Sequence, residues 1–284
     1  MTSSDTPGTE QPTATPPHLE EPQYQTLEVR RDGDLLWVTL NDPQRANALS
    51  PRMITELTSL YHRPLRSQGV RALLLSGAGK NFSAGADLAH LRALRDAGLE
   101  ENRIDSRRLR DLFEAVLRQP ALTIALVHGA CVAGGCGLAT AHDYVIATPD
   151  ARFLYSEVKI GFVAALVATF LPLRVRGQHL RELLLHPEFV PAPRALEIGL
   201  INRVTGPAVD LAESGRELAA AVLSNASSES IARTKALILD LIGRPLSEAL
   251  DHAAEVNAGA RGTDDCKHGI ATFLQTKQAP NWRE

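Results

Sequence analysis

The sequence predicts an α/β protein. Apolar runs of strand length alternate with helical patterns from Tyr24 to about Val204, and only helical patterns follow Pro207. Of the 284 residues, 44% are apolar and 22% charged, which is typical of a globular chain and excludes collagen-like and coiled-coil proteins. At about 150 residues per domain, the length allows about two units. We therefore expect a disordered tail over residues 1–22, an α/β core over 23–206 and a helical region over 207–284.

The first elements predicted are a β-hairpin and a helix. Apolar runs at residues 24–30 and 35–40 flank an Asp-Gly step, which is a common hairpin turn. Ser50 then stands directly before Pro51, and apolar residues follow at three- and four-residue spacing. Because serine is favoured at an N-cap and proline at the first helical position, a helix is predicted from residue 51.

The later elements follow from the same patterns. Residues 70–76 form a continuous apolar run, and residues 123–127 and 144–147 are further strand candidates. After Pro207, four segments carry helical spacing: 211–223, 228–241, 246–258 and 266–277. Four helices without a sheet predict a C-terminal cap or an assembly surface.

Charge and cysteine content narrow the function classes. Lys plus Arg number 30 and Asp plus Glu 33, a net charge of −3, whereas a general nucleic-acid binder would show a basic stripe. The three cysteines lack CxxC spacing, so neither a disulfide scaffold nor a metal site is predicted. No run of 18 apolar residues occurs, and residues 1–22 lack the basic residues of a targeting sequence. We expect a cytoplasmic protein with neither a nucleic-acid nor a membrane partner.

Two loops rich in small residues form the first candidate site. Residues 81–88 follow one predicted strand, and Asp87 is suited to cap a following helix. Residues 128–139 follow the next strand and hold four glycines and three alanines. If a helix begins near Gly134, its uncovered N–H groups can hold an anion, and one N–H from each loop could stabilise an enolate oxygen. The alternative is that these glycines only permit tight turns and close packing.

Glu157 is a second candidate, because an acidic side chain within the apolar run 153–162 costs free energy unless it is paired or used. Burial would raise its pKa toward the range useful for general acid–base catalysis. From spacing alone, the alternative is a surface carboxylate at a strand end. His142 and Asp143 are expected to make structural hydrogen bonds, since no motif places a nucleophile beside them, and Arg174 is expected to be solvated.

Taken together and in order, these segments resemble the enoyl-CoA hydratase/isomerase (crotonase) superfamily, from about Tyr24 to the C-terminus. Residues 41–50 (NDPQRANALS), 195–204 (ALEIGLINRV) and 269–274 (GIATFL) support the resemblance. It implies a spiral of ββα turns with a helical C-terminal region that builds trimers, which can pair into hexamers. It also implies an acyl-CoA thioester substrate whose carbonyl binds between two backbone N–H groups. Coenzyme A is part of that substrate, so no separate cofactor is implied.

The family's site residues carry over position by position. The two N–H donors match Ala86 and Gly134, and the acid–base residue matches Glu157. Ala84 and Ala46 match positions along the path of the adenine and pantetheine groups.

Further substrate-contacting positions are implied, some of them at the C-terminal end. Asp87, Gly137 and Phe162 are further expected substrate contacts. Family members also close the coenzyme A site with a C-terminal Phe and a nearby Lys; Phe273 matches, while Lys277 falls one place late.

The sequence departs from the two-glutamate hydratases at Gly137, where those enzymes carry a second acid. Keeping only Glu157 also suits single-acid isomerases, which move a proton between C2 and C4. Dienoyl-CoA isomerases add an Asp eight residues after the retained acid; Ala165 stands there, so that activity is not expected.

A narrower resemblance points to bacterial methylglutaconyl-CoA and isohexenylglutaconyl-CoA hydratases, which also lack the first glutamate. Residues 82–88 (FSAGADL) and 156–161 (SEVKIG) carry it. The small residue at position 137 is expected to leave room for a branched acyl chain or a second water. We expect hydration of a branched or glutaconyl-type enoyl-CoA, with 3,2-isomerisation by Glu157 alone as the alternative. The alternative from a different functional class is a catalytically weak protein that binds CoA esters or serves in assembly.

Overall fold

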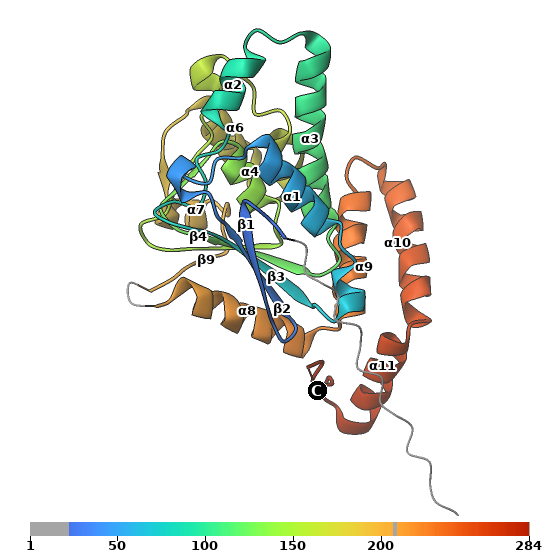
Figure 1. Ribbon diagram of the computed structural model, residues 1–284. Coiled ribbons are helices and arrows are strands. Elements are labelled where there is room, and N and C mark those ends of the chain that lie inside the picture. The colour runs from blue at the N-terminus through green and yellow to red at the C-terminus, as the bar shows by residue number, and fades with distance from the viewer. Residues whose placement is uncertain (1–22, 207–208, 284) are drawn as a thin grey trace, which may run out of the picture.

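A six-stranded sheet forms the centre of the protein in the computed structural model, which describes residues 23–206 and 209–283 (Figure 1). The expected tail over residues 1–22 lies outside the described residues. The strands lie side by side in chain order; β1 and β2 are antiparallel and every later pair is parallel. They are β1 (Leu27–Asp32), β2 (Leu35–Leu40), β3 (Ala72–Gly77), β4 (Leu122–Val127), β6 (Tyr144–Ala147) and β9 (Arg203–Val204).

The predicted hairpin is confirmed, although its first strand begins at Leu27 rather than Tyr24. Asp32 pairs with Leu35, so the turn consists of two residues, and Gly33 occupies the left-handed region at φ 61°. A glycine adopts that conformation without the steric cost that a side chain would add.

A second, smaller layer accompanies the large sheet. It contains β5 (Ala130–Val132), β7 (Arg152–Leu154) and β8 (Val190–Pro191), and single bridges between Leu49 and Ala86 and between Ser83 and Cys131 extend it. Each winding of the chain therefore contributes one strand to the large sheet, one extended segment to the small layer and one helix. This matches the spiral of ββα turns that the resemblance implies.

The helices begin where the sequence signals place them. Ser50 caps the first one, since its Oγ accepts a hydrogen bond from the N–H of Met53 at 3.2 Å. The helices are α1 (Pro51–Tyr61), α2 (Leu88–Leu94), α3 (Leu99–Arg118), α4 (Gly134–Thr140), α5 (Val167–Phe170), α6 (Gly177–Leu185), α7 (Ala192–Glu197), α8 (Leu211–Asn225), α9 (Ser228–Asp240), α10 (Leu246–Arg261) and α11 (Asp264–Thr276). Short 3-10 helices cover Pro43–Arg45, Leu65–Gln68, Glu157–Ile160 and Leu171–Leu173.

Both faces of the large sheet are buried, which explains why its strands read as continuous apolar runs. Alternate residues such as Leu36 and Leu73 pack into the cluster that contains α1, α3 and α4. Their neighbours, such as Leu74 and Leu126, pack against Leu223 of α8 on the opposite face (Figure 1).

The four predicted C-terminal helices form, but they do not behave as one group. Helix α8 lies against the sheet, whereas α9, α10 and α11 stand as a column at one side and contain no fully buried residue (Figure 1). Leu246 is 76% exposed and Leu274 is 63% exposed. The boundary expected at residue 207 thus leaves one helix with the core. No helix in the described ranges has the length and apolarity to cross a membrane.

Candidate active site

Three backbone stretches of the small layer lie side by side and carry most of the candidate residues. The N–H of Leu49 donates to the carbonyl of Gly85 at 2.7 Å, and the N–H of Val132 donates to the carbonyl of Ser83 at 2.9 Å. Segments that are far apart in the sequence are therefore joined by main-chain hydrogen bonds, whose geometry does not depend on side-chain rotamers.

Glycines allow these stretches to approach one another. A Cβ atom at Gly85 would lie 2.5 Å from the carbonyl oxygen of Val132, and one at Gly135 would lie 2.8 Å from the Cβ of Ser83. Real Cβ atoms do not come so close, so both positions require glycine. The close-packing interpretation of the two loops is thus correct, and the packing also places the candidate donors.

The backbone N–H groups of Ala86 and Gly134 are the predicted donors. Ala86 follows Gly85, and Gly134 is the first residue of α4, where helical N–H groups have no partner inside the helix. Within residues 23–206 and 209–283, neither N–H donates a hydrogen bond to a protein acceptor. Both N–H groups are free to donate a hydrogen bond to an oxygen atom of a ligand.

The turn before Asn47 brings Ala46 beside the glycine-rich loop. The N–H of Ala84 donates to the carbonyl of Ala46 at 2.9 Å. Ala46 and Asn47 have φ values of 50° and 54°, a conformation that costs non-glycine residues about 1–3 kcal/mol each. The amide of Asn47 donates to the carbonyls of Ala78 at 2.8 Å and Asn81 at 2.9 Å, which holds the turn. The sequence motif includes Asn47, but spacing gave no sign of this bracing role.

Asp87 caps α2, as the sequence predicts. Its Oδ1 accepts hydrogen bonds from the N–H groups of Ala89 at 2.7 Å and His90 at 3.2 Å, and Arg45 lies 3.7 Å from Oδ2. The carboxylate therefore fixes the start of α2, and its expected contact with substrate stays a prediction.

Glu157 opens the short helix that follows β7. It is half-buried, and its Oε2 atom is buried without a hydrogen-bond partner among the described residues. Burial raises the pKa of this carboxyl, and a hydrogen bond from its own N–H acts in the opposite direction. Phe162 lies close by, since its N–H donates to the carbonyl of Glu157 at 3.0 Å, and its side chain is 61% exposed.

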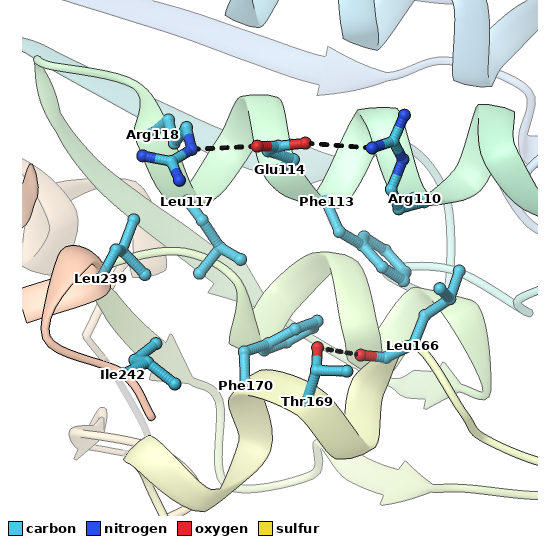
Figure 2. A pocket seen from close by; sticks show the side chains of 10 residues that line it. All are labelled: Arg110, Phe113, Glu114, Leu117, Arg118, Leu166, Thr169, Phe170, Leu239 and Ile242. Carbon is cyan, nitrogen blue, oxygen red and sulfur yellow. Dashed lines mark hydrogen bonds and ion pairs between the residues drawn. The ribbon is translucent and has the colours of Figure 1, made fainter. Parts of the chain in front are cut away.

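The space above Gly137 is filled. A Cβ atom there would lie 2.7 Å from Cζ of Phe113 and 3.0 Å from Cγ2 of Val167. The ring of Phe113 comes from α3 and points toward Leu166 and Phe170 (Figure 2). The expected room for a branch or a second water above Gly137 is therefore taken by two apolar side chains.

Phe273 and Lys277 lie apart from the other candidate residues. Phe273 lies near the end of α11 and Lys277 directly follows that helix, at the opposite end of the molecule from α2 (Figure 1). Phe273 is 53% exposed. Within one chain, the structure does not bring these two residues to Ala86, Gly134 or Glu157.

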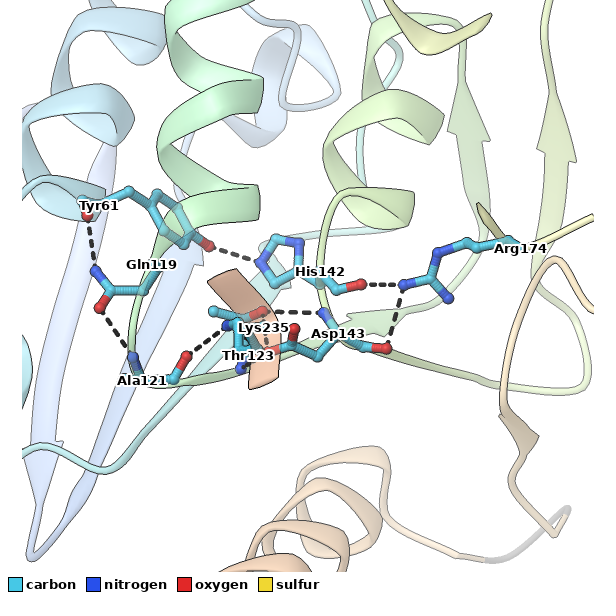
Figure 3. Close-up of polar contacts among 8 residues, drawn as sticks. All are labelled: Tyr61, Gln119, Ala121, Thr123, His142, Asp143, Arg174 and Lys235. Atoms are coloured by element: carbon cyan, nitrogen blue, oxygen red, sulfur yellow. Dashed lines mark hydrogen bonds and ion pairs between the residues drawn. The ribbon is translucent and has the colours of Figure 1, made fainter. Parts of the chain in front are cut away.

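The His142–Asp143 pair is structural, as predicted (Figure 3). The Nδ1 atom of His142 lies 2.8 Å from the carbonyl of Leu138 and so carries the proton, while Nε2 accepts from the hydroxyl of Tyr61 at 2.6 Å. Burial lowers the pKa of His142 to about 3. The side chain is neutral near pH 7 and has both nitrogens occupied.

The expectation that Arg174 is solvated is wrong. Its guanidinium donates to the backbone carbonyls of Thr140, His142 and Asp143, at and just beyond the end of α4 (Figure 3). Carbonyls at a helix C-terminus have no partners within the helix, and a cation there is favourable. The sequence separation of 34 positions between Arg174 and Thr140 explains why a local pattern does not reveal the contact.

Comparison with known proteins identifies the family and its fold. The model of the enoyl-CoA hydratase/isomerase family matches residues 30–284. The chain belongs to this family. Its crotonase fold and its classification as a hydratase/isomerase-type enzyme are confirmed.

Individual members of the enoyl-CoA hydratase/isomerase family align over most of the chain. A Thermus thermophilus protein named "Putative enoyl-CoA hydratase" is 44% identical over 245 residues, covering 86% of this chain and 96% of the relative. The human mitochondrial Delta(3,5)-Delta(2,4)-dienoyl-CoA isomerase is 32% identical over 268 residues, covering 90% of this chain and 81% of the relative. The crystal structure of an enoyl-CoA hydratase from Mycobacterium smegmatis superposes with a TM-score of 0.83 at 31% identity, covering 92% of this chain and 100% of the other.

Proposed function

We propose that this enzyme adds water across the double bond of a 2-enoyl-CoA ester, with Glu157 as its single acid–base residue. The observation that carries the proposal is the half-buried Glu157 carboxylate, whose Oε2 has no hydrogen-bond partner in the described part of the chain. A buried carboxylate that only supports the fold is normally paired, because leaving it unpaired costs free energy. A general base must keep one oxygen free for the proton that it takes.

The proposed oxyanion site consists of the N–H groups of Ala86 and Gly134. When water attacks C3 of the substrate, negative charge moves onto the thioester oxygen and forms an enolate. Each positioned donor contributes about 2.7–4 kcal/mol to stabilising such a charge in the transition state. Glu157 takes one proton from the attacking water and returns it to C2, so that one water is added in total. The chemistry is proton transfer, and coenzyme A enters as part of the substrate.

The proposed substrate is an enoyl-CoA with an apolar acyl group, and a branch on that group is not supported at the filled space above Gly137. Ala84 and Ala46 supply small side chains along the proposed path of the coenzyme A arm. Phe113 and Val167 form an apolar wall at Gly137. A glutaconyl chain would bring a terminal carboxylate toward side chains that cannot pair with it, which is unfavourable. The narrower likeness to methylglutaconyl-CoA hydratases therefore supports the one-glutamate chemistry more than the acidic acyl group.

A second candidate activity is 3,2-enoyl-CoA isomerisation. Two-glutamate hydratases hold water between two carboxylates, whereas Phe113 and Val167 fill the corresponding space at Gly137. With one carboxylate, Glu157 could remove a proton at C2 and return it at C4. Position 165 carries alanine, so the dienoyl-CoA isomerase activity named for the human relative is not proposed.

A homotrimer, with hexamers formed by pairing, is the proposed assembly. The column of α9, α10 and α11 exposes apolar side chains such as Leu246, Leu250 and Leu274 that a single chain leaves uncovered. A second copy that covers this column would also bring Phe273 and Lys277 to a neighbouring site. This arrangement reconciles their proposed contact with coenzyme A with their distance from Glu157 in one chain.

The decisive experiment follows the α,β-unsaturated thioester absorbance with purified protein. Crotonyl-CoA, 3-methylcrotonyl-CoA and 3-methylglutaconyl-CoA are offered in parallel, and a 3-enoyl-CoA is offered separately. We expect absorbance loss with at least one 2-enoyl-CoA, and loss of that activity in Glu157→Gln. The matched control is Glu188→Gln, which makes the same change at a carboxylate that is 75% exposed and should retain full activity.

The alternatives give different results. Formation of the absorbance from the 3-enoyl-CoA, with no hydration of any 2-enoyl-CoA, would replace hydration by isomerisation. Equal turnover in wild type and Glu157→Gln would remove Glu157 from the mechanism. Binding of coenzyme A esters without any turnover would favour a binding protein.

A further inference from the structure

We infer that Phe113, supported by Val167, is the stop that limits the length of the acyl chain. The inference rests on the proposed function, because it takes the thioester carbonyl to lie at the N–H of Gly134. Phe113 is not part of the proposed proton transfer. Its proposed role is to set which acyl chains fit.

The position of Gly137 on α4 brings the stop next to the acyl carbons. Gly137 follows Gly134 by three residues, which is about 4.5 Å along a helix axis and nearly one full turn. A side chain above Gly137 therefore faces the carbons that follow the thioester carbonyl. The atoms found there are Cζ and Cε2 of Phe113, 2.7 Å and 3.2 Å from an ideal Cβ at Gly137, and Cγ2 of Val167 at 3.0 Å.

The Phe113 ring also lines a hollow. Its volume is about 240 Å³, and it lies between α3, α5 and the end of α9 (Figure 2). Phe113 belongs to its lining, whereas Gly137 and Glu157 do not. The other apolar lining residues are Leu117, Leu166, Phe170, Leu239 and Ile242. One aromatic ring is thus the partition between the α4 backbone and an apolar space.

Packing holds the partition in place. The Phe113 ring contacts the Phe170 ring edge to face, with centroids 5.6 Å apart at 72°, and Phe113 is only 3% exposed. At the rim of the hollow, Glu114 pairs with Arg110 at 3.6 Å and with Arg118 at 3.0 Å (Figure 2). The charged groups are engaged with each other at the rim, so the interior suits a hydrocarbon tail.

The test replaces the partition and measures chain-length preference. We would prepare Phe113→Ala and Phe113→Leu and determine kcat/KM for trans-2-enoyl-CoA esters of C4, C6, C8 and C10. A methylene gained in an apolar pocket changes specificity about 10–200-fold. We expect the C10-to-C4 ratio of kcat/KM to rise at least about tenfold in Phe113→Ala and by less in Phe113→Leu.

Leu239→Ala is the matched control, since Leu239 lines the same hollow from α9 but is neither among the nearest atoms above Gly137 nor part of the ring contact that holds Phe113. It should leave the chain-length ratio unchanged. If Phe113→Ala does not fold, Phe113→Leu and Val167→Ala carry the test, because each shortens a side chain at the same point.

The failure of the inference and the failure of the proposed function are distinguishable. An active wild type whose Phe113 variants keep the wild-type ratio overturns the stop and leaves the function intact. A wild type that turns over no enoyl-CoA overturns the function. In that case the Kd ratio of decanoyl-CoA to butyryl-CoA still tests the stop, which predicts tighter decanoyl-CoA binding in Phe113→Leu; an unchanged Kd ratio overturns it.

Discussion

Asp143 and Glu157 are two acidic side chains in similar sequence surroundings, and the structure treats them in opposite ways. Oδ2 of Asp143 accepts hydrogen bonds from the N–H of Thr123 at 2.8 Å, from its Oγ1 at 2.9 Å and from Nζ of Lys235 at 2.6 Å (Figure 3). Oε2 of Glu157 is buried and finds no partner among the described residues. Each lies within or beside an apolar run, so local sequence alone does not separate them.

The difference teaches that the partners of a buried charge indicate its use. A carboxylate with three donors contributes to stability, and removing it leaves the Lys235 ammonium without a counter-charge, with only the carbonyl of Ala121 as its hydrogen-bond partner. A carboxylate with an unpaired oxygen reduces stability, and its retention needs another explanation, which the proposed proton transfer supplies.

The largest expected effect is the loss of activity in Glu157→Gln. Removing a general acid–base group lowers kcat about 10²–10⁴-fold. The melting temperature should stay the same or rise, because the neutral amide removes an unpaired buried charge. Thermal unfolding beside steady-state kinetics checks both statements. A clear fall in melting temperature would instead make Glu157 a structural residue like Asp143.

Asp143→Ala should show the opposite behaviour, with a large effect on stability. Breaking a buried ion pair by removing one partner costs about 3–5 kcal/mol, and the Lys235 side chain is only 12% exposed. Urea unfolding measures the loss. The double variant Asp143→Asn with Lys235→Met should recover most of it, since the unpaired cation is then absent. A double variant as unstable as Asp143→Ala would contradict this explanation.

Gly137→Ala should be destabilising by about 1–3 kcal/mol, because overpacking forces neighbouring atoms to move. The added Cβ would lie 2.7 Å from the Phe113 ring. Combining it with Phe113→Leu should restore part of the stability, which denaturant unfolding of the two variants would show. Equal stability of wild type and Gly137→Ala would mean that the Phe113 ring moves aside at little cost in free energy.

The pH dependence of the free energy of unfolding is the smallest expected effect when it is expressed per pH unit. It has opposite signs at His142 and Glu157. His142 has a folded pKa of about 3 against an ordinary 6.5, so the unfolded chain binds more protons between these values. The free energy of unfolding should therefore fall as pH drops from 6.5 toward 3, by at most about 1.4 kcal/mol per pH unit.

For Glu157 the folded pKa is raised above 4.5, so the folded chain binds more protons in that window. Its contribution to stability is present below pH 4.5 and is lost as pH rises through the folded pKa. Unfolding curves of wild type, His142→Gln and Glu157→Gln across this range separate the two contributions. Parallel curves for all three proteins would contradict both.

Local patterns predict much of the fold, because its signals are local. The cap at Ser50, the proline at position 51 and the cap at Asp87 act within four residues, and strands buried on both faces are visible as apolar runs. What local sequence cannot show are contacts between distant segments, such as Arg174 with the carbonyls beyond α4 and Phe113 above Gly137. These depend on the spiral bringing separate turns together.

The order of the strands has a consequence for synthesis on the ribosome. Each strand of the large sheet pairs with the large-sheet strand made before it, so an emerging segment meets a template that has already been translated. Helix α8 is the exception, because Leu223 covers Leu74 and Leu126 only after the whole sheet exists. Until residue 225 has left the exit tunnel, one apolar face of the nascent sheet stays open to water. That interval is when the growing chain is most exposed to aggregation and to capture by chaperones.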